Sequence, residues 1–329
     1  CFRYFPLPIV LDILSSSHYI DVTLPSGSLS SFLLTMRFHL IFLFIPYLVL
    51  SLPIRTTSKR NNERKLPEAI IIGVKKAGTR ALLEFLRLNP HIKAPGPEVH
   101  FFDKNFEKGL DWYRSQMPES GDGDVTIEKS PSYFISKTAP SRIKEINPNM
   151  KLIVVLRDPV TRAISDYTQA SSKRRLGQMP SFERMAVGDC APWSKVNCSV
   201  KIRGVNSGWG AVRIGQYHKY LQRWLKEFPL AQFHFVDGQK LIDEPAEEVK
   251  KVEEFLGLKP VVSPADFELD SVKKFPCIKN PDETHHCLGK TKGRPHPKVD
   301  EPVLKRLKRF YEPENDRLFA LIHQKFQWN

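Results

Sequence analysis

The stretch EAIIIGVKKAGTRALLEFLRLNP, residues 68–90, decides the fold of this chain. Residues 69–74 form an apolar, β-branched run of strand length, and residues 79–88 place apolar side chains at helical spacing before Pro90. A basic loop that contains a glycine joins the two. Backbone N–H groups converge at the start of a helix in such a loop, so we expect it to bind a phosphate or sulfate group.

The loop is similar to the nucleoside triphosphate motif GxxxxGK[ST] but departs from it at two positions. Gly73 and Gly78 match its glycines, whereas Thr79 and Arg80 stand where the motif has Lys and then Ser or Thr. The Lys reaches the β- and γ-phosphates and the hydroxyl holds Mg²⁺, so their absence argues against a kinase or ATPase. The alternative to an anion site is an ordinary solvated turn. The expected anion-binding loop consists of Lys76, Ala77, Gly78, Thr79 and Arg80.

Composition places the chain among globular proteins with a basic surface. It has 329 residues, of which 41% are hydrophobic and 26% are charged. Fifty basic and 36 acidic residues leave a net charge of +14. Such a charge favours a polyanionic partner, which leaves nucleic acid, an acidic membrane surface and a sulfated glycan as candidates.

The N-terminal segment has the pattern of a targeting sequence. Residues 1–35 show no periodicity, and we expect Met36 to be the true start. The apolar run 38–52 is 15 residues long, shorter than the ~20 residues that a spanning helix needs. We expect residues 36–53 to be a signal peptide or an uncleaved signal anchor in the membrane, with a buried core segment as the alternative. Residues 54–65 then form a basic stem, and residues 66–329 form a domain in the secretory pathway.

Cysteine usage agrees with that compartment. The five cysteines are Cys1, Cys190, Cys198, Cys277 and Cys287. The four that follow the expected start allow three pairings, of which 190 with 198 and 277 with 287 is the simplest. Free buried thiols are the alternative.

The sequence offers one N-glycosylation site and little sign of a metal site. Asn197 begins the sequon Asn-Cys-Ser in a loop-like region, residues 188–210. There is no CxxC motif, and the His285-His286 pair beside Cys287 lacks the spacing of a zinc site. We therefore expect no metal.

The segment APGPEVHFFD, residues 94–103, carries the best acid–base candidates. Glu98, His100 and Asp103 place two carboxylates and an imidazole in one proline-rich loop. Taken singly, each is as well explained by a side chain that faces water.

Two further strands end in residues that can bind ligands. The strand expected at 125–128 is followed by Lys129, and the apolar run 150–156 is followed by Arg157. Ligands bind at strand ends in parallel sheets, so Arg157 and, on the next helix, Ser165 could hold a second phosphate. A structural ion pair between Arg157 and Asp158 is the competing interpretation.

The rest of the chain alternates helices with strands. We expect a strand at 232–236 and helices at 160–169, 212–228, 245–256, 304–311 and 315–326. The apolar stripe of helix 212–228 is interpreted as core. This alternation predicts a mainly parallel sheet. Residues 277–299 look like basic coil, in which Lys292 and Arg294 could hold a nucleotide phosphate or simply be solvated.

Residues 66–329 resemble the heparan sulfate glucosamine 3-O-sulfotransferases of the Golgi. The resemblance rests on six motifs in order: PEAIIIGVKKAGTRALLEFL, EVHFFD, EKSPSYF, VLRDPVTRAISDYTQ, the FPL to FHFVDG run, and TKGRPHP. It implies a single P-loop-like α/β/α domain of three layers. It also implies a sulfo donor, 3′-phosphoadenosine 5′-phosphosulfate (PAPS), and heparan sulfate as the polyanion rather than nucleic acid.

The resemblance also implies roles for individual residues. The loop 76–80 would bind the phosphosulfate, Arg157 and Ser165 the 3′-phosphate, and residues 291–294 would close over the nucleotide. Glu98 would be the catalytic base, with His100 and Asp103 beside it and Lys76 stabilising the leaving group. The closing residues are Thr291, Lys292, Gly293 and Arg294. The acceptor would contact Arg80, Glu98, Asp103, Lys129 and Gln169.

The sequence departs from the family at a few positions. Ala77 replaces the usual first glycine of the loop, and Phe275-Pro276 stands where the family usually has Phe-Tyr before Cys277. The segment with Cys190 and Cys198 also differs. Pro276 favours one alternative, a heparin-binding protein without activity. An N-sulfotransferase, which shares the fold, is the other.

Overall fold

The computed structural model describes residues 62–174, 178–188, 201–272, 274–279, 284–289 and 294–328. All of them belong to one unit of the chain, Arg60–Asn329. Several sequence-based expectations lie outside these ranges: the leader 36–53, the stem up to residue 61, Cys190, Cys198, Asn197 and residues 291–293. Within the described ranges, no helix combines the length and the apolar character needed to cross a membrane.

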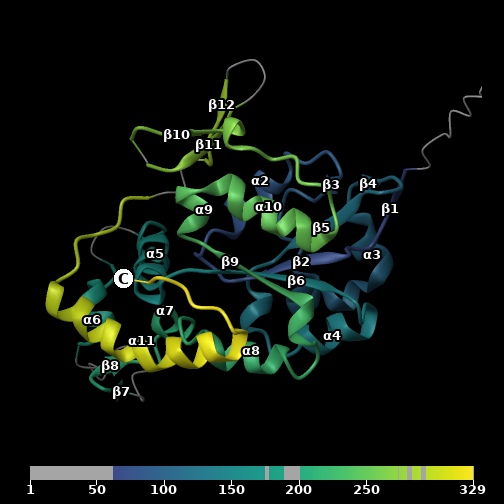
Figure 1. Ribbon diagram of the computed structural model, residues 1–329. Coiled ribbons are helices and arrows are strands. Elements are labelled where there is room, and N and C mark those ends of the chain that lie inside the picture. Colours follow the sequence, from purple (N-terminus) through teal and green to yellow (C-terminus); the bar gives the residue numbers. More distant parts are fainter. Residues whose placement is uncertain are drawn as a thin grey trace, which may run out of the picture. The chain divides into compact units, whose positions relative to one another are not determined.

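A five-stranded sheet forms the centre of the unit (Figure 1). Its order is β3 (Ile92–Lys93), β5 (Val125–Lys129), β2 (Ala69–Gly73), β6 (Lys151–Leu156) and β9 (Phe233–Asp237). Every neighbouring pair is parallel. Residues of β2 and β5 are buried throughout, as expected for strands covered on both faces. The predicted mainly parallel α/β sheet is confirmed.

Helices cover both faces of this sheet. The helices are α2 (Thr79–Leu86), α3 (Gly109–Ser115), α4 (Ala139–Ile146), α5 (Pro159–Ser171), α6 (Phe182–Ala186), α7 (Gly210–Arg213), α8 (Tyr217–Trp224), α9 (Lys240–Asp243), α10 (Pro245–Leu256) and α11 (Glu301–Ile322). In Figure 1, α2, α9 and α10 lie on one side of the sheet and α4, α8 and α11 on the other. The domain thus has the three layers of an α/β/α fold.

Smaller antiparallel sheets form where the sequence predicted loops. Strand β1 (Glu63–Arg64), at the end of the expected stem, pairs with β4 (Glu119–Ser120). Strands β7 (Lys201–Ile202) and β8 (Val205–Asn206) pair inside the expected loop 188–210. Strands β10 (Phe267–Leu269), β11 (Pro276–Lys279) and β12 (His285–His286) form a third sheet, of which β12 and most of β11 lie in the segment 277–299 that was expected to be coil. Strands this short carry no clear alternation in sequence.

The helix expected at 212–228 is broken at Gly215. Its apolar stripe is nevertheless core, because Tyr217, Leu221 and Trp224 are buried. A Cβ atom at Gly215 would lie 2.8 Å from the Tyr311 ring and 2.9 Å from Pro159. The break therefore occurs where the backbone packs directly against α11 and the start of α5.

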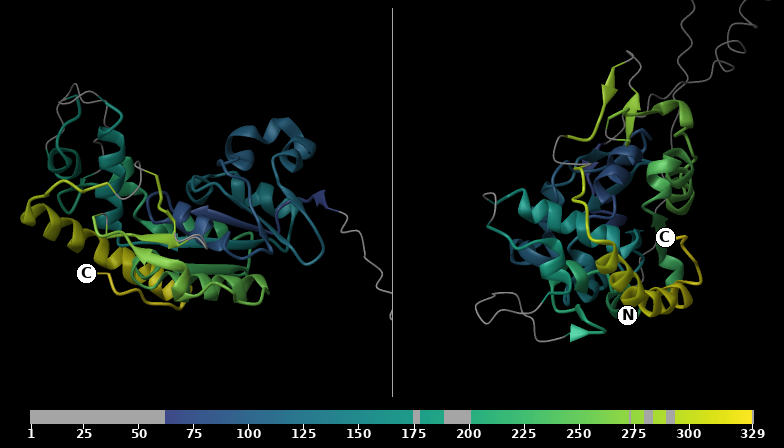
Figure 2. Two further views of the ribbon diagram at one scale, coloured as in Figure 1. Left: turned by 90° about the horizontal axis from the view of Figure 1, so that it is seen from above. Right: turned by 90° about the vertical axis from the view of Figure 1, so that its left-hand side faces the viewer.

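The two terminal helices expected on either side of Pro313 are a single helix, α11. It appears as one uninterrupted yellow helix in both views of Figure 2. Proline removes one backbone hydrogen bond and crowds the preceding turn. Buried side chains on both sides of Pro313, including Tyr311 and Leu318, hold the helix together across that position.

Gly215 provides a first test of this packing. We expect Gly215→Ala to lower the free energy of unfolding by about 1–3 kcal/mol, because the added methyl group overlaps Tyr311 and Pro159. Gly210→Ala is the matched control, since nothing lies within 4 Å of a Cβ at that position. Urea denaturation of both variants measures the difference. Equal stabilities would contradict the close packing.

Candidate functional site

The loop after β2 has the geometry of an anion site. Helix α2 begins at Thr79 with Gly78 as its cap, without a side-chain hydrogen bond and without an acidic residue in its first turn. Its first N–H groups therefore have no acceptor within the helix. Lys76 and Gly78 adopt positive φ angles of 75° and 120°. Ala77 is not among the described residues with positive φ, so the loop does not require glycine at that position.

A buried ion pair between Arg162 and Asp166 holds the backbone at the start of the loop. Arg162 of α5 is fully buried and donates to the Asp166 carboxylate at 3.1 Å and to the Lys75 carbonyl at 3.3 Å. Lys75 Nζ lies 3.0 Å from the other oxygen of Asp166. Burial alone would raise the pKa of Asp166, but the charges of Arg162 and Lys75 hold it below its usual value. No sequence pattern predicts this support, because it joins residues 87 positions apart.

Arg157 lies directly after β6 with its Nε atom buried. Among the described residues this atom has no hydrogen-bond partner, and burial lowers the pKa of the guanidinium. The described contacts contain no ion pair with Asp158, whose carboxylate instead caps α5 through the Thr161 N–H at 2.7 Å and hydroxyl at 2.6 Å. Ser165 is half-buried on the same helix. Arg157 thus has a donor available for a ligand.

The segment before α11 passes close to these cations. His296 is exposed, but partial desolvation and the charges of Arg157 and Lys76 lower the pKa of its imidazole. His296 was not among the predicted site residues, although it belongs to the TKGRPHP motif. Arg294, which was predicted, is half-buried in the same segment. Thr291, Lys292 and Gly293 lie outside the described residues.

Glu98 is held between a buried lysine and a histidine. Lys129 Nζ donates to Glu98 Oε1 at 2.6 Å, and His100 Nε2 lies 3.2 Å from Glu98 Oε2. The Lys129 side chain is 3% exposed, whereas the Glu98 side chain is 41% exposed. Burial lowers the pKa of Lys129 even though Glu98 favours its charged form. The carboxylate is therefore oriented by two partners and still accessible from solvent.

The opposite edge of the His100 ring faces a second carboxylate. His100 Nδ1 lies 3.2 Å from Asp103 Oδ1 and 3.1 Å from the Ser132 hydroxyl. Ser132 in turn donates to Asp103 Oδ2 at 2.5 Å. Residues 101–105 form a π-helical turn, η1 (Phe101–Asn105), which brings Asp103 back to the Nδ1 edge of the ring. The structure thus brings the three acid–base candidates together as a chain from Glu98 through His100 to Asp103.

Arg80 connects the anion loop to the loop that carries Glu98. Its guanidinium donates to the Gly96 carbonyl at 2.6 Å and lies 2.6 Å from the Glu84 carboxylate. Its positive charge also lowers the pKa of Lys129. In the sheet, β2 and β5 are neighbours, with Ile71 opposite Lys129. Gln169 is half-buried on α5, and no described hydrogen bond joins it to the Glu98 cluster.

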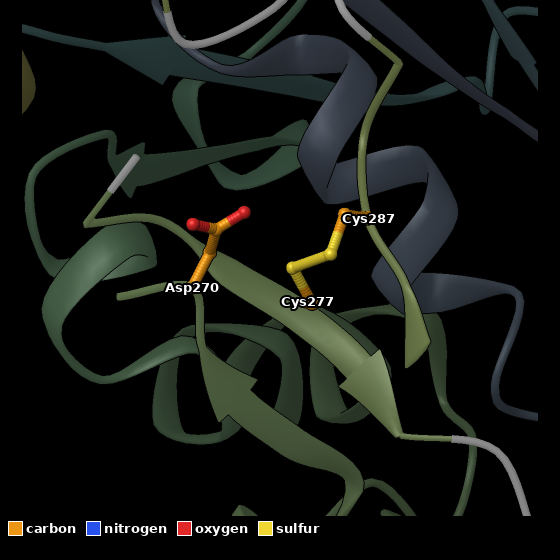
Figure 3. A group of neighbouring side chains, drawn as sticks. All are labelled: Asp270, Cys277 and Cys287. Carbon is orange, nitrogen blue, oxygen red and sulfur yellow. A yellow bond between two sulfur atoms is a disulfide. The ribbon is translucent and has the colours of Figure 1, made fainter. Parts of the chain in front are cut away.

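A disulfide joins Cys277 of β11 to Cys287, with an S–S distance of 2.05 Å. The carboxylate of Asp270 lies beside it (Figure 3), and the three side chains are close enough to be considered as metal ligands. Both sulfur atoms are already bonded to each other, so no thiolate is present to bind a metal. Pro276, where the family usually has Tyr, begins β11 opposite Leu269, and Phe275 packs partly buried against the core.

A buried glutamate lies beneath the site and was not predicted. Glu128 is fully buried at the end of β5, and desolvation raises its pKa to about 7. The hydroxyls of Ser130, Tyr133 and Tyr113 donate to it. In the sequence, Glu128 looks like an ordinary strand residue beside Lys129. Its burial depends on the fold, in which Tyr113 of α3 and Tyr133 pack against it.

The Glu128 pKa predicts a pH dependence of stability. Because the folded carboxyl has a pKa of about 7 against 4.5 for the exposed group, the folded state binds the proton more tightly. This contribution is fully present below pH ~4.5 and is lost as the pH rises through ~7, on the order of 3 kcal/mol in all. The titratable groups that interact with Glu128 are Tyr113, Tyr133, Asp103 and Lys129.

Glu128→Gln isolates this contribution. We expect the stability of the wild-type chain relative to the variant to fall between pH 5 and pH 8, measured by chemical denaturation at each pH. Comparison with the variant cancels the titration of other groups, such as His218 and His234. A stability difference that does not change with pH would contradict the raised pKa.

Comparison with known proteins identifies the class. Residues 66–322 match the sulfotransferase domain family. The structure of a sulfotransferase from Alicyclobacillus acidocaldarius superposes with a TM-score of 0.57 at 22% identity, covering 80% of this chain and 98% of that one, which shows a shared fold. The chain thus contains a sulfotransferase domain.

Curated relatives narrow the class further. The chain is 46% identical over 280 residues to human heparan sulfate glucosamine 3-O-sulfotransferase 3B1, covering 84% of this chain and 68% of the relative. It is 49% identical over 267 residues to human heparan sulfate glucosamine 3-O-sulfotransferase 6, covering 80% of this chain and 74% of that relative. The chain belongs to the heparan sulfate glucosamine 3-O-sulfotransferase family.

The residues present fit PAPS, the sulfo donor that the family implies. The uncapped start of α2 offers N–H donors for one anionic group, and Lys76 lies beside them. The buried Arg157 Nε supplies an unused donor for a second. A donor with a 5′-phosphosulfate and a 3′-phosphate requires two anion sites, and these residues offer one for each.

Proposed function

We propose that this chain transfers the sulfo group of PAPS to the 3-hydroxyl of glucosamine residues in heparan sulfate. The observation that carries the proposal is the oriented carboxylate of Glu98, held by Lys129 at 2.6 Å and His100 at 3.2 Å. Arg80 ties this carboxylate's loop to the anion loop by donating to the Gly96 carbonyl.

Glu98 acts as the general base. A sugar hydroxyl is a weak nucleophile at neutral pH, and a carboxylate in hydrogen-bond reach removes its proton during attack. Glu98 is exposed enough to meet the acceptor, whereas Lys129 and His100 restrict its rotation. Asp103 and Ser132 fix the His100 ring from the other side. Asp103 therefore contributes through His100, and Lys129 compensates the charge of Glu98.

Lys76 and the start of α2 stabilise the charge on the leaving group. As the sulfo group departs, negative charge grows on the bridging oxygen, and fixed cations or N–H donors at that point lower the barrier. Lys76 is half-buried in the loop, next to the first N–H groups of α2. Arg157, Ser165 and Arg294 hold the nucleotide, together with residues 291–293. We propose that this set of cations works without a metal ion.

The acceptor is proposed to lie across Arg80, Lys129 and Gln169. The net charge of +14 favours a polyanionic chain, and screening by salt should weaken its binding. We further propose that the chain acts in the Golgi lumen, with residues 36–53 as a signal peptide or membrane anchor; the apolar run 38–52 and the heparan sulfate enzymes among its relatives support this.

An acceptor comparison tests the proposal. The complete chain is incubated with PAPS carrying a labelled sulfo group and with heparan sulfate or chondroitin sulfate, at low and moderate salt. We expect label in heparan sulfate, little in chondroitin sulfate, and a lower rate at moderate salt. Equal labelling of both glycans would refute the acceptor assignment.

A further inference from the structure

The buried carboxylate of Glu128 has no part in the reaction described so far, yet it lies at the centre of a hydrogen-bond network. Ser130 Oγ donates to its Oε1 atom at 2.5 Å, and the Tyr133 hydroxyl donates to the same atom at 3.1 Å. The Tyr113 hydroxyl donates to Oε2 at 3.3 Å. Glu128, Ser130 and Tyr133 are all completely buried, so water does not compete for these bonds.

Two of the three hydroxyls also hold the backbone of the acid–base loop. The N–H of His100 donates to Ser130 Oγ at 2.9 Å, and the N–H of Phe102 donates to the Tyr133 hydroxyl at 3.2 Å. A backbone N–H can only donate, so each oxygen must accept there and offer its own hydrogen elsewhere. Glu128 accepts both hydrogens. The carboxylate thus fixes the direction of both bonds to the loop.

The loop needs such support because its backbone is strained. His100 has a φ of 53°, in the left-handed region that non-glycine residues rarely adopt. This conformation turns the chain into η1 and places His100 Nε2 at 3.2 Å from Glu98. The residue after Glu128 is Lys129, which holds the other oxygen of Glu98. Both partners of Glu98 are therefore anchored next to Glu128.

We propose that Glu128 is a positioning residue for sulfo transfer. Through Ser130 and Tyr133 it holds the backbone of residues 100–102, and through that backbone it sets the orientation of His100 against Glu98. It does not contact the substrates itself. The inference rests on the proposed function, in which Glu98 is the base.

Two tyrosines of equal burial provide a matched test. Tyr133→Phe and Tyr113→Phe each remove one hydroxyl bonded to Glu128, and both side chains are 0–1% exposed. Only Tyr133 also accepts from the loop. We expect kcat of Tyr133→Phe to fall about tenfold, the factor that one lost hydrogen bond contributes, and kcat of Tyr113→Phe to stay within about twofold. The KM for PAPS should be unchanged in both.

A pair of serines provides the same comparison for the second bond to the loop, from the His100 N–H to Ser130 Oγ. Ser130→Ala removes the acceptor of the His100 N–H, whereas Ser120→Ala removes a hydroxyl of similar burial that bonds Thr126 and the Glu63 carbonyl. We expect kcat to fall about tenfold for Ser130→Ala only. Glu128→Gln should instead keep kcat within about twofold of the wild type, because its one amide oxygen can accept from both Ser130 and Tyr133, which donate to the same atom, Oε1.

Amide hydrogen exchange separates this proposal from the proposed function. Exchange at the His100 and Phe102 amides should be faster in Ser130→Ala and Tyr133→Phe than in the wild type, whether or not the chain is active. Faster exchange with unchanged kcat would overturn the positioning role alone. Equal loss of kcat in Tyr133→Phe and Tyr113→Phe would also overturn it. Absence of sulfo transfer by the wild-type chain would instead overturn the proposed function.

Discussion

Glu98→Gln is expected to lower the rate of sulfo transfer by about 10²–10⁴-fold, the usual contribution of a general base. The amide has the shape of the carboxylate, and its oxygen can still accept from Lys129, so the loop should keep its conformation. Binding of PAPS should be unchanged, because the anion loop and Arg157 are untouched. Initial rates and calorimetric titration with the donor measure the two quantities separately.

Glu107→Gln is the control for this substitution. Glu107 is exposed on a short helical turn, η2 (Phe106–Lys108), which follows η1 in the chain. Glu107→Gln should transfer the sulfo group at the wild-type rate, since this exposed carboxylate has no part in the proposed site. Loss of donor binding together with transfer in Glu98→Gln would show that Glu98 supports the fold of the site and is not the base.

Lys76→Ala is expected to reduce kcat by about 10²–10³-fold, the range found when a single donor to developing negative charge is removed. Donor affinity should also fall, because the proposed function places the same cation against the phosphosulfate. The backbone should be little affected: lysine already adopts the left-handed φ of 75°, and alanine carries the same strain. Rates at saturating donor separate the loss of kcat from the loss of affinity.

Lys75→Ala is the matched control in the neighbouring position. The Lys75 side chain is 54% exposed and pairs with Asp166, which keeps Arg162 as a partner at 3.1 Å. Exposed ion pairs contribute little, about 0–1 kcal/mol, so kcat should change by no more than a few-fold. A larger loss of kcat in Lys75→Ala than in Lys76→Ala would show that Lys75 stabilises the leaving group, and it would contradict the assignment of Lys76.

The sequence predicted the central fold because its strongest patterns are local. The run 69–74 and the helix that follows it were recognisable from apolar spacing alone, and they appear as β2 and α2. The breaks were harder to predict, because they depend on distant contacts. Gly215 interrupts a regular apolar stripe at the point where Tyr311 and Pro159 pack against its backbone. Pro313 fails to interrupt α11 because buried residues on both sides stabilise the helix.

The same distinction applies to the site. The chemistry of EVHFFD was visible in the residue types, so Glu98, His100 and Asp103 could be predicted as a group. Their geometry was not, because it depends on Lys129 and Ser132, thirty residues further along the chain. Glu128 and Arg162 carry no local pattern that separates them from exposed charges. Their roles follow from burial, which only the folded chain reveals.

The position of the transferred sulfo group tests the central claim most directly. The complete chain is incubated with labelled PAPS and heparan sulfate, and the product is degraded to disaccharides and separated. The proposed function predicts label on the 3-oxygen of glucosamine. Label on nitrogen or on another hydroxyl would contradict the acceptor assignment, and no label despite donor binding would identify a binding protein without activity.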